Sequence, residues 1–329
     1  MNKRKLGRTN LHVSELCFNA AKLGWAADEE GSMSLLDAYR EAGGGCVQSL
    51  GRCWSNDIGD AADARSEEIV GRWLKSRAMP RDQVVIATRL PLRRPTAGGS
   101  ISFVNMIRES CEASLRRLRS GHIDLAVIEW DECLIPVGDV LEAIDMLFRA
   151  GLVRYAVASG FPSWRIVDSL HRSSLRNQCR FEAVQADFSL LKRTREETET
   201  LALCREHRLG FIASSPLAGG YLGKTSLLGG AESDRGDHWL SERFGNSVAE
   251  RVRATVAEIA ERQSASQAQV ALAWVLRYPE VASVLIAPTS QSELHDLVEA
   301  RNCVLTEADL ASLANVSIAE DDTLQLRHA

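Results

Sequence analysis

The chain has 329 residues, of which 45% are hydrophobic and 25% are charged, a composition typical of a globular protein. Its net charge of −5 gives no electrostatic basis for nucleic acid or an anionic membrane as a partner. No apolar run approaches the ~20 residues that a membrane-spanning helix needs, and the first residues lack the apolar core of a signal peptide. We therefore expect a soluble, cytoplasmic protein that acts on a small molecule; the sequence carries no signal for an oligomeric state.

The strands are predicted from short apolar runs that alternate with longer amphipathic runs. These runs are continuously apolar, as expected for parallel strands that are covered on their outer face. In chain order they are Glu15–Ala20, Cys46–Leu50, Val84–Leu90, Asp124–Trp130, Val153–Gly160, Ala183–Ser189, Gly210–Leu217 and Ala282–Pro288.

Helices are predicted between the strands, where apolar residues recur at three- and four-residue spacing. They are Ser32–Ala42, Ser66–Ser76, Phe103–Arg119, Val140–Ala150, Ser163–His171, Thr194–His207, Val248–Arg262 and Ala265–Leu276. Eight such units predict an α/β fold of the (β/α)₈ TIM barrel type, one domain over residues 1–329 with extra C-terminal helices. The alternative is an open doubly wound sheet, which the lack of a GxGxxG motif after the first strand disfavours.

Two segments stand apart from this repeat. Residues 1–14 contain a Thr-Asn turn between two short runs, which predicts a β-hairpin before the barrel. Residues 218–245 form a long irregular segment after the seventh strand, on the side where barrel active sites lie. A loop of this length indicates a lid over the site or a disordered segment.

The eight cysteines are spread at wide, irregular intervals, and none falls in a CxxC pair. This pattern opposes a disulfide framework or a zinc ribbon and favours buried, reduced thiols. We predict no metal site.

Five segments resemble the aldo-keto reductase superfamily, in the order that the family has them. They are KLGRTNLHVSEL at residues 5–16, RSEEIVGRWL at 65–74, GLVRYAVASGF at 151–161, SPLAGGYLGK at 215–224 and QAQVALAW at 267–274. The bacterial and potassium-channel-β-like branch is the most similar. The resemblance implies a TIM barrel and a hydride transfer from NADPH to a carbonyl, in which a Tyr hydroxyl protonates the alkoxide and Lys, Asp and His support it.

All four positions of the family's catalytic tetrad carry other residues. Where the family has Asp, Tyr, Lys and His, the matching positions hold Ser49, Trp54, Arg89 and Glu129. An indole N–H cannot serve as the acid near neutral pH, and a guanidinium stays protonated. The resemblance therefore predicts the fold but not the family's standard reaction.

The nicotinamide cofactor site is retained in part. The residues that match the family's cofactor contacts are Ser159, Gln185, Ser215, Leu217, Gly219, Lys224 and Ser290. The Tyr that stacks on nicotinamide is replaced by Ser214, the phosphate-binding Arg by Thr289, and Glu293 would repel an adenosine 2′-phosphate. We therefore expect a degraded site for NADP(H) or NAD(H), or no cofactor at all.

Arg89 and Glu129 end neighbouring strands at the C-terminal face, where barrel enzymes collect their catalytic groups, and Lys22 is expected to face the same mouth. In the functional interpretation, Arg89 binds a carboxylate or an oxyanion and Glu129 moves a proton. In the alternative, the two side chains form an inert ion pair.

Three functions are compatible with these residues. We favour a biosynthetic enzyme that performs elimination, isomerisation or cyclisation on a small carbonyl or carboxylate metabolite. The second is a nicotinamide-dependent oxidoreductase with a non-standard proton donor. The third is a non-catalytic cofactor-sensing or regulatory protein.

Overall fold

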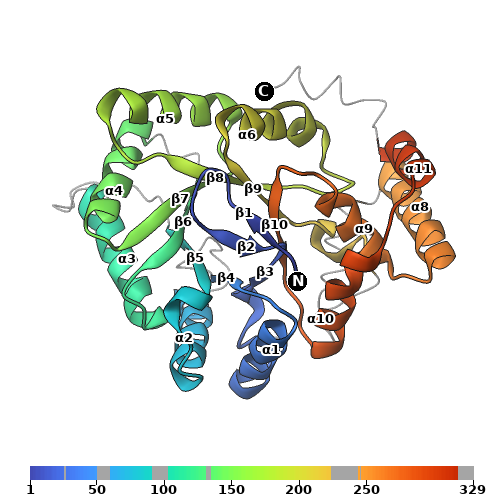
Figure 1. The fold of residues 1–329 in the computed structure, drawn as a ribbon, viewed down its shortest axis with the longest axis horizontal. Coiled ribbons are helices and arrows are strands. Elements are labelled where there is room, and N and C mark those ends of the chain that lie inside the picture. Colours follow the sequence, from blue (N-terminus) through green and yellow to red (C-terminus); the bar gives the residue numbers. More distant parts are fainter. Residues whose placement is uncertain are drawn as a thin grey trace.

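The computed structural model describes residues 1–25, 27–49, 60–90, 103–130, 135–223, 244 and 246–317, with residues 60–63 described by their backbone. In this part of the chain, eight parallel strands close into a barrel in the order β10-β3-β4-β5-β6-β7-β8-β9, and helices surround it (Figure 1). The barrel strands are β3 (Leu16–Asn19), β4 (Cys46–Ser49), β5 (Val85–Leu90), β6 (Ile123–Glu129), β7 (Val153–Ser159), β8 (Phe181–Asp187), β9 (Gly210–Ser214) and β10 (Val281–Ile286). The closed sheet confirms the predicted barrel and excludes the open doubly wound alternative.

Most helices lie on the outside of the barrel, and α8 and α11 lie beyond that ring (Figure 1). The helices are α1 (Glu29–Glu41), α2 (Asp60–Ser76), α3 (Phe103–Leu118), α4 (Val137–Arg149), α5 (Ser163–Arg176), α6 (Leu201–His207), α8 (Ser247–Gln263), α9 (Gln267–Leu276), α10 (Gln291–Val298) and α11 (Glu307–Ser317). Side chains cap several starts: Asp28 accepts a hydrogen bond from the Gly31 N–H, and Ser266 forms a capping box with Gln269. α10 and α11 are the predicted extra C-terminal helices.

Several helices differ in their bounds from the prediction, and α2 begins at Asp60 where the prediction began at Ser66. α5 continues past His171 to Arg176 and ends where Asn177 takes the left-handed conformation, with φ 49°. The helix predicted over Thr194–His207 is divided, because Glu196–Thr200 forms a π-helical turn before α6 begins.

The predicted N-terminal hairpin is confirmed as the antiparallel pair β1 (Lys3–Lys5) and β2 (His12–Ser14). It crosses one end of the barrel in Figure 1. Leu6 and Val13 are fully buried and pack on the apolar side chains inside the barrel. The hairpin therefore covers the N-terminal ends of the strands and leaves the C-terminal ends, here called the mouth, for a site.

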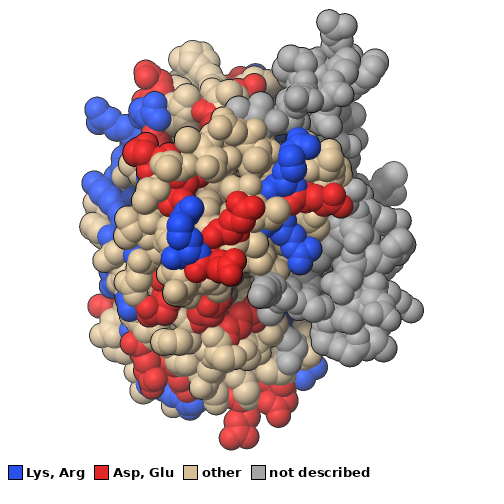
Figure 2. Space-filling view, turned by 90° about the vertical axis from the view of Figure 1, so that its right-hand side faces the viewer, with Lys and Arg blue, Asp and Glu red and all other residues tan. Residues whose placement is uncertain are grey.

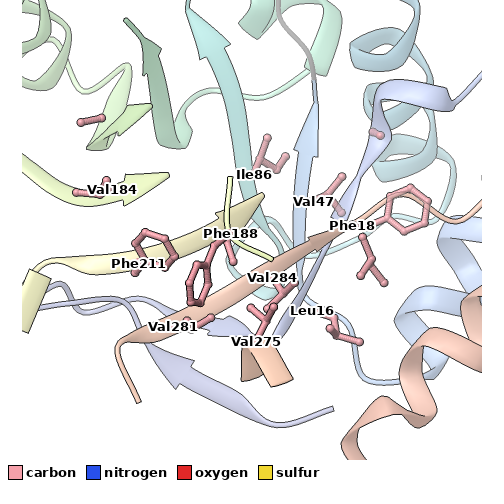
Figure 3. Close-up of a cluster of buried hydrophobic side chains, with 14 of the residues drawn as sticks. Leu16, Phe18, Val47, Ile86, Val184, Phe188, Phe211, Val275, Val281 and Val284 are labelled. Carbon is pink, nitrogen blue, oxygen red and sulfur yellow. The ribbon is translucent and has the colours of Figure 1, made fainter. Parts of the chain in front are cut away.

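The main hydrophobic core lies between the strands and the surrounding helices. Figure 3 shows part of it, with side chains from several strands meeting Val275 of α9. Phe188 is central to this packing, because its ring contacts Phe211, Trp274 and Tyr278. Burial of these large side chains on the outer face of the sheet explains why the strands read as unbroken apolar runs.

The side of the molecule that carries α8 and α11 is mixed in charge. Figure 2 shows basic and acidic side chains interspersed on the α8–α11 side, with no large area of one sign. Cys17, Cys46, Cys111 and Cys204 are buried free thiols, and no described helix combines the length and the apolar character required to span a bilayer. Of the predicted lid over residues 218–245, residues 224–243 and 245 lie outside the described part.

Candidate functional site

The polar side chains inside the barrel gather at the mouth. Side chains that point into such a barrel stack in layers of four from alternate strands, because neighbouring strands are staggered by one residue. The register of the strands gives an apolar set of lower layers and a polar set of upper layers. Going outward, the polar layers hold Gln48 and Gln185, then Asn19, Arg89, Ser159 and Ser214, then Glu129 and Asp187.

A cleft of about 250 Å³ opens between these upper layers and the loop that follows β9. It extends from Arg89 past Ser214 to the start of α10. The residues that line it are Asn19, Lys22, Arg89, Asp187, Ser214, Ser215, Pro216, Leu217, Gly219, Gly220, Leu285, Ile286, Ala287, Thr289, Glu293 and Leu297. The cleft is the natural candidate for a ligand site, since it is concave, mixed in polarity and placed at the C-terminal ends of the strands.

Arg89 and Glu129 form the predicted contact. Arg89 Nη1 lies 3.3 Å from each carboxylate oxygen of Glu129, across the neighbouring strands β5 and β6. The two side chains are 21% and 26% exposed, so both reach solvent at the mouth. The pair is therefore accessible to a ligand and is not sealed in the core.

Asp187 is an acidic group of the cleft that sequence reasoning missed. Its carboxylate accepts hydrogen bonds from the hydroxyls of Ser214 (2.8 Å) and Ser215 (2.9 Å), and Lys192 Nζ lies 3.1 Å away. Burial raises the pKa of the Asp187 carboxyl, but Lys192 and the two hydroxyls outweigh it, so the pKa is held below its ordinary value. Asp187 therefore contributes a fixed negative charge to the cleft.

Asp187→Asn is expected to make the protein less sensitive to acid. A carboxyl whose pKa is lower in the folded chain stabilises that chain above its unfolded pKa of about 4, and this stabilisation is lost as the pH falls through the folded value. The melting temperatures of the wild type and the variant, measured from pH 7 to pH 3, should differ by a constant amount above about pH 5 and converge below about pH 4. Parallel curves over the whole range would contradict this assignment.

Lys22 lines the cleft, as predicted, and Glu293 lines it too. Burial lowers the pKa of the Lys22 ammonium, and the negative charge of Glu293 partly offsets that effect. Glu293 is held in place by Thr289, whose backbone N–H (2.7 Å) and hydroxyl (2.8 Å) both donate to its carboxylate. The end of the cleft near α10 thus carries a negative charge in a fixed position.

The other predicted cofactor residues are partly assembled. Leu217 and Gly219 line the cleft with Ser215, and Ser290 caps α10 by accepting a hydrogen bond from the Glu293 N–H. Ser159 is buried beside Glu129 in the strand register, and Gln185 is buried with both amide atoms lacking a hydrogen-bond partner. Lys224 and Trp54 lie outside the described residues.

These residues fit a dinucleotide unevenly. An unpartnered carboxamide at Gln185 suits a nicotinamide amide, whereas Ser214 offers no ring to stack on it. Glu293 places a negative charge in the lining of the cleft, which would disfavour a phosphate bound beside it. Among the described side chains, no group of three or more His, Cys, Asp or Glu is arranged to hold a metal ion.

The structure does not bring Ser49 to the mouth. Ser49 pairs in register with Thr88, whose hydroxyl donates to Glu67 on α2, so Ser49 lies on the helix-facing side of the sheet. Its own hydroxyl donates to the Ala87 carbonyl at 3.3 Å. The inward position of β4 is Gln48, which sequence reasoning did not single out; its alternation with inward-facing Cys46 is the signal that could have found it.

Comparison with known proteins gives consistent results. A model of the aldo/keto reductase family matches residues 27–318, a range that includes strands β4 to β10. The uncharacterized oxidoreductase YrpG of Bacillus subtilis is 31% identical over 94% of both chains. Aldo-keto reductase AMT2 of Alternaria alternata is 28% identical over 94% of this chain and 90% of its own. A probable voltage-gated potassium channel subunit beta of Arabidopsis thaliana is 25% identical over 91% of each chain.

Proposed function

This chain belongs to the aldo/keto reductase family, and we propose that it is an enzyme that performs acid–base chemistry on a small carbonyl- or carboxylate-bearing metabolite. The observation that carries the proposal is the contact of Arg89 with Glu129 at adjacent strand ends. Both groups reach solvent at the mouth, where barrel enzymes place their catalytic side chains. A biosynthetic reaction of the elimination, isomerisation or cyclisation type suits such a pair.

Glu129 is the proposed proton acceptor. Its carboxylate reaches solvent at the mouth and lies beside Arg89, which lines the cleft, so it is placed to take up a proton from a bound ligand. In the proposed step the carboxylate removes a proton from the carbon next to a carbonyl, the C–H electron pair forms a C=C bond, and the π pair of the carbonyl moves to its oxygen. Return of the proton to the opposite face of the same carbon gives isomerisation by inversion, and departure of a group from the neighbouring carbon with its electron pair gives elimination.

Arg89 is the proposed anion-binding residue. Its guanidinium remains charged, and it presents N–H donors in a fixed plane to a carboxylate or to the oxyanion that forms as the proton leaves. Both contacts with Glu129 use Nη1, and Arg89 lines the cleft in which a ligand would lie. Electrostatic stabilisation of the developing negative charge is the larger part of its proposed role.

A nicotinamide-dependent oxidoreductase is the second candidate, and the names of the relatives favour it. Gln185 and the loop residues Ser215, Leu217 and Gly219 would hold the dinucleotide, which when bound supplies or accepts a hydride. Glu129 or water would then provide the proton. The similarity to a potassium channel β subunit adds a third candidate, a non-catalytic protein that senses a cofactor.

Calorimetric titration with NADH, NAD⁺, NADPH and NADP⁺ separates these candidates. If the oxidoreductase or the sensor is correct, we expect NADH to bind about tenfold more tightly than NADPH because Glu293 faces the cleft. Glu293→Gln should narrow that difference, since it removes the charge and keeps the size of the side chain. Absence of binding by all four dinucleotides would remove both of these candidates and leave acid–base chemistry without a cofactor.

A further inference from the structure

Two glutamine side chains inside the barrel have no hydrogen-bond partner. Gln48 and Gln185 are each 1% exposed, and both the amide nitrogen and the amide oxygen of each are buried without a partner. Buried carboxamides are normally hydrogen-bonded, because an unmet donor or acceptor destabilises the folded state. Such a pair therefore needs an explanation beyond packing.

The strand register brings these two carboxamides into one layer. Gln48 pairs with Ala87, and a stagger of one residue per strand leads from Gln48 on β4 to Val127 on β6 and Gln185 on β8. The same stagger leads on to Leu285 on β10. Since Val127 and Leu285 belong to the apolar cluster inside the barrel, Gln48 and Gln185 also point inward, from opposite strands.

This layer lies directly beneath the cleft and is here called the floor. One of its members, Leu285, lines the cleft, and the two buried carboxamides lie at the same depth inside the barrel as Leu285. The next layer below is apolar, with Cys17, Ala87, Val157 and Ile212. The next layer above contains Arg89, which is on the strand adjacent to Gln48. A ligand in the cleft thus lies beside a cation, with two neutral carboxamides in the layer beneath it.

We propose that Gln48, together with Gln185, binds a neutral oxygen of the substrate, and that the substrate is a small 2-oxo or 2-hydroxy carboxylate whose carboxylate lies on Arg89. This inference rests on the proposed function of Arg89. A carboxamide both donates and accepts hydrogen bonds, so it binds a carbonyl and a hydroxyl equally well, whereas an Asp or a Lys would favour one of them. The floor is consequently suited to a carbonyl group that becomes an enol during the reaction.

Binding of three matched acids to the wild type and to Gln48→Leu tests this assignment. The probes are 2-oxobutyrate, 2-hydroxybutyrate and butyrate, and their dissociation constants are measured by calorimetry. We expect the wild type to bind the 2-oxo and 2-hydroxy acids about tenfold more tightly than butyrate, a difference of about 1.4 kcal/mol. Gln48→Leu should bind all three acids as weakly as the wild type binds butyrate, because Leu removes the amide and keeps a similar volume.

Thermal unfolding without ligand provides an independent readout. If Gln48 serves a ligand, Gln48→Leu removes an unpaired buried amide and should raise the melting temperature of the free protein. If Gln48 instead serves the fold, the same variant should melt at a lower temperature, which would overturn the proposal. Gln185→Leu, on the opposite strand, should raise the melting temperature in the same way, because it removes the second unpaired buried amide.

The outcomes separate this inference from the one on which it rests. Equal affinity of the wild type for the three acids would overturn the role of the floor and leave the anion site at Arg89 standing. No binding of any acid would overturn the anion site and the floor together. Retention of the tenfold preference in Gln48→Leu would assign the neutral oxygen to another residue and overturn the role of Gln48.

Discussion

Replacing Glu129 by Gln should slow proton exchange at the substrate by about 100- to 1,000-fold, the contribution that a positioned general base commonly makes. The amide has the size of the carboxylate but cannot accept a proton from carbon. Because Glu129 is a quarter exposed and pairs with Arg89 at the mouth, its loss should change the melting temperature little. The expected result is therefore a loss of chemistry without a loss of structure.

Deuterium uptake provides the measurement. Small 2-oxo acids are incubated with the protein in D₂O without cofactor, and loss of the proton signal next to the carbonyl is followed by NMR. Glu112→Gln is the matched control, because Glu112 pairs with Arg108 at 2.9 Å on the exposed side of α3. If the two variants exchange protons at the same rate and the Glu129 variant only melts earlier, Arg89 and Glu129 are the inert ion pair.

Gly71→Ala should destabilise the protein by about 3 kcal/mol, at the upper end of the range for overpacked sites. A Cβ at Gly71 would lie 2.2 Å from the Arg117 carbonyl oxygen and 2.8 Å from the Leu118 carbonyl carbon. These are backbone atoms of α3 and its end, so no side-chain rotation relieves the contact and the two helices must separate. The free energy of unfolding is measured by urea denaturation.

Separation of α2 from α3 would also change the position of Arg89 in the candidate site. Glu67, one turn before Gly71, accepts hydrogen bonds from Thr88 on β5 (2.6 Å) and from Arg117 (2.7 Å). Thr88 precedes Arg89, so a shift of α2 should move the guanidinium. Gly138→Ala is the control. Gly138 lies in the first turn of α4, and a Cβ there would meet only the Arg176 side chain, at an ordinary contact distance of 3.8 Å. An unchanged unfolding free energy in Gly71→Ala would contradict the close approach of the two helices.

The order of strands and helices could be predicted from the sequence, because every barrel strand is covered on both sides and reads as an apolar run. The residues at which the strands end, at the mouth of the barrel, were less predictable. The run at Gly210–Leu217 ends as a strand at Ser214, since Ser215 takes a positive φ of 51° to start the loop. Apolar character continues through Leu217, which lies in the loop, lines the cleft and packs against the edge of the core, so composition could not mark the end of the strand.

The candidate site was only partly predictable, for a similar reason. Arg89 and Glu129 stand alone as charges at the ends of apolar strands, and their contact follows from the order of the strands. Gln48 and Ser49 are adjacent polar residues, and a shift of one residue exchanges the inward and outward positions. The sequence therefore does not show which of the two faces the interior of the barrel. The prediction placed Ser49 at the mouth, whereas in the structure Gln48 takes the inward position.

The stacking of apolar layers under polar ones bears on how such a protein can diverge. On β5, Ala87 belongs to the sealed interior and Arg89, two residues later, belongs to the mouth. Heritable changes at the upper positions alter reactivity while the lower positions keep the scaffold folded. A lineage can thus exchange its chemistry without passing through unfolded intermediates. Along β5, the tolerance of the fold to substitution is expected to rise between Ala87 and Arg89, which are only two residues apart.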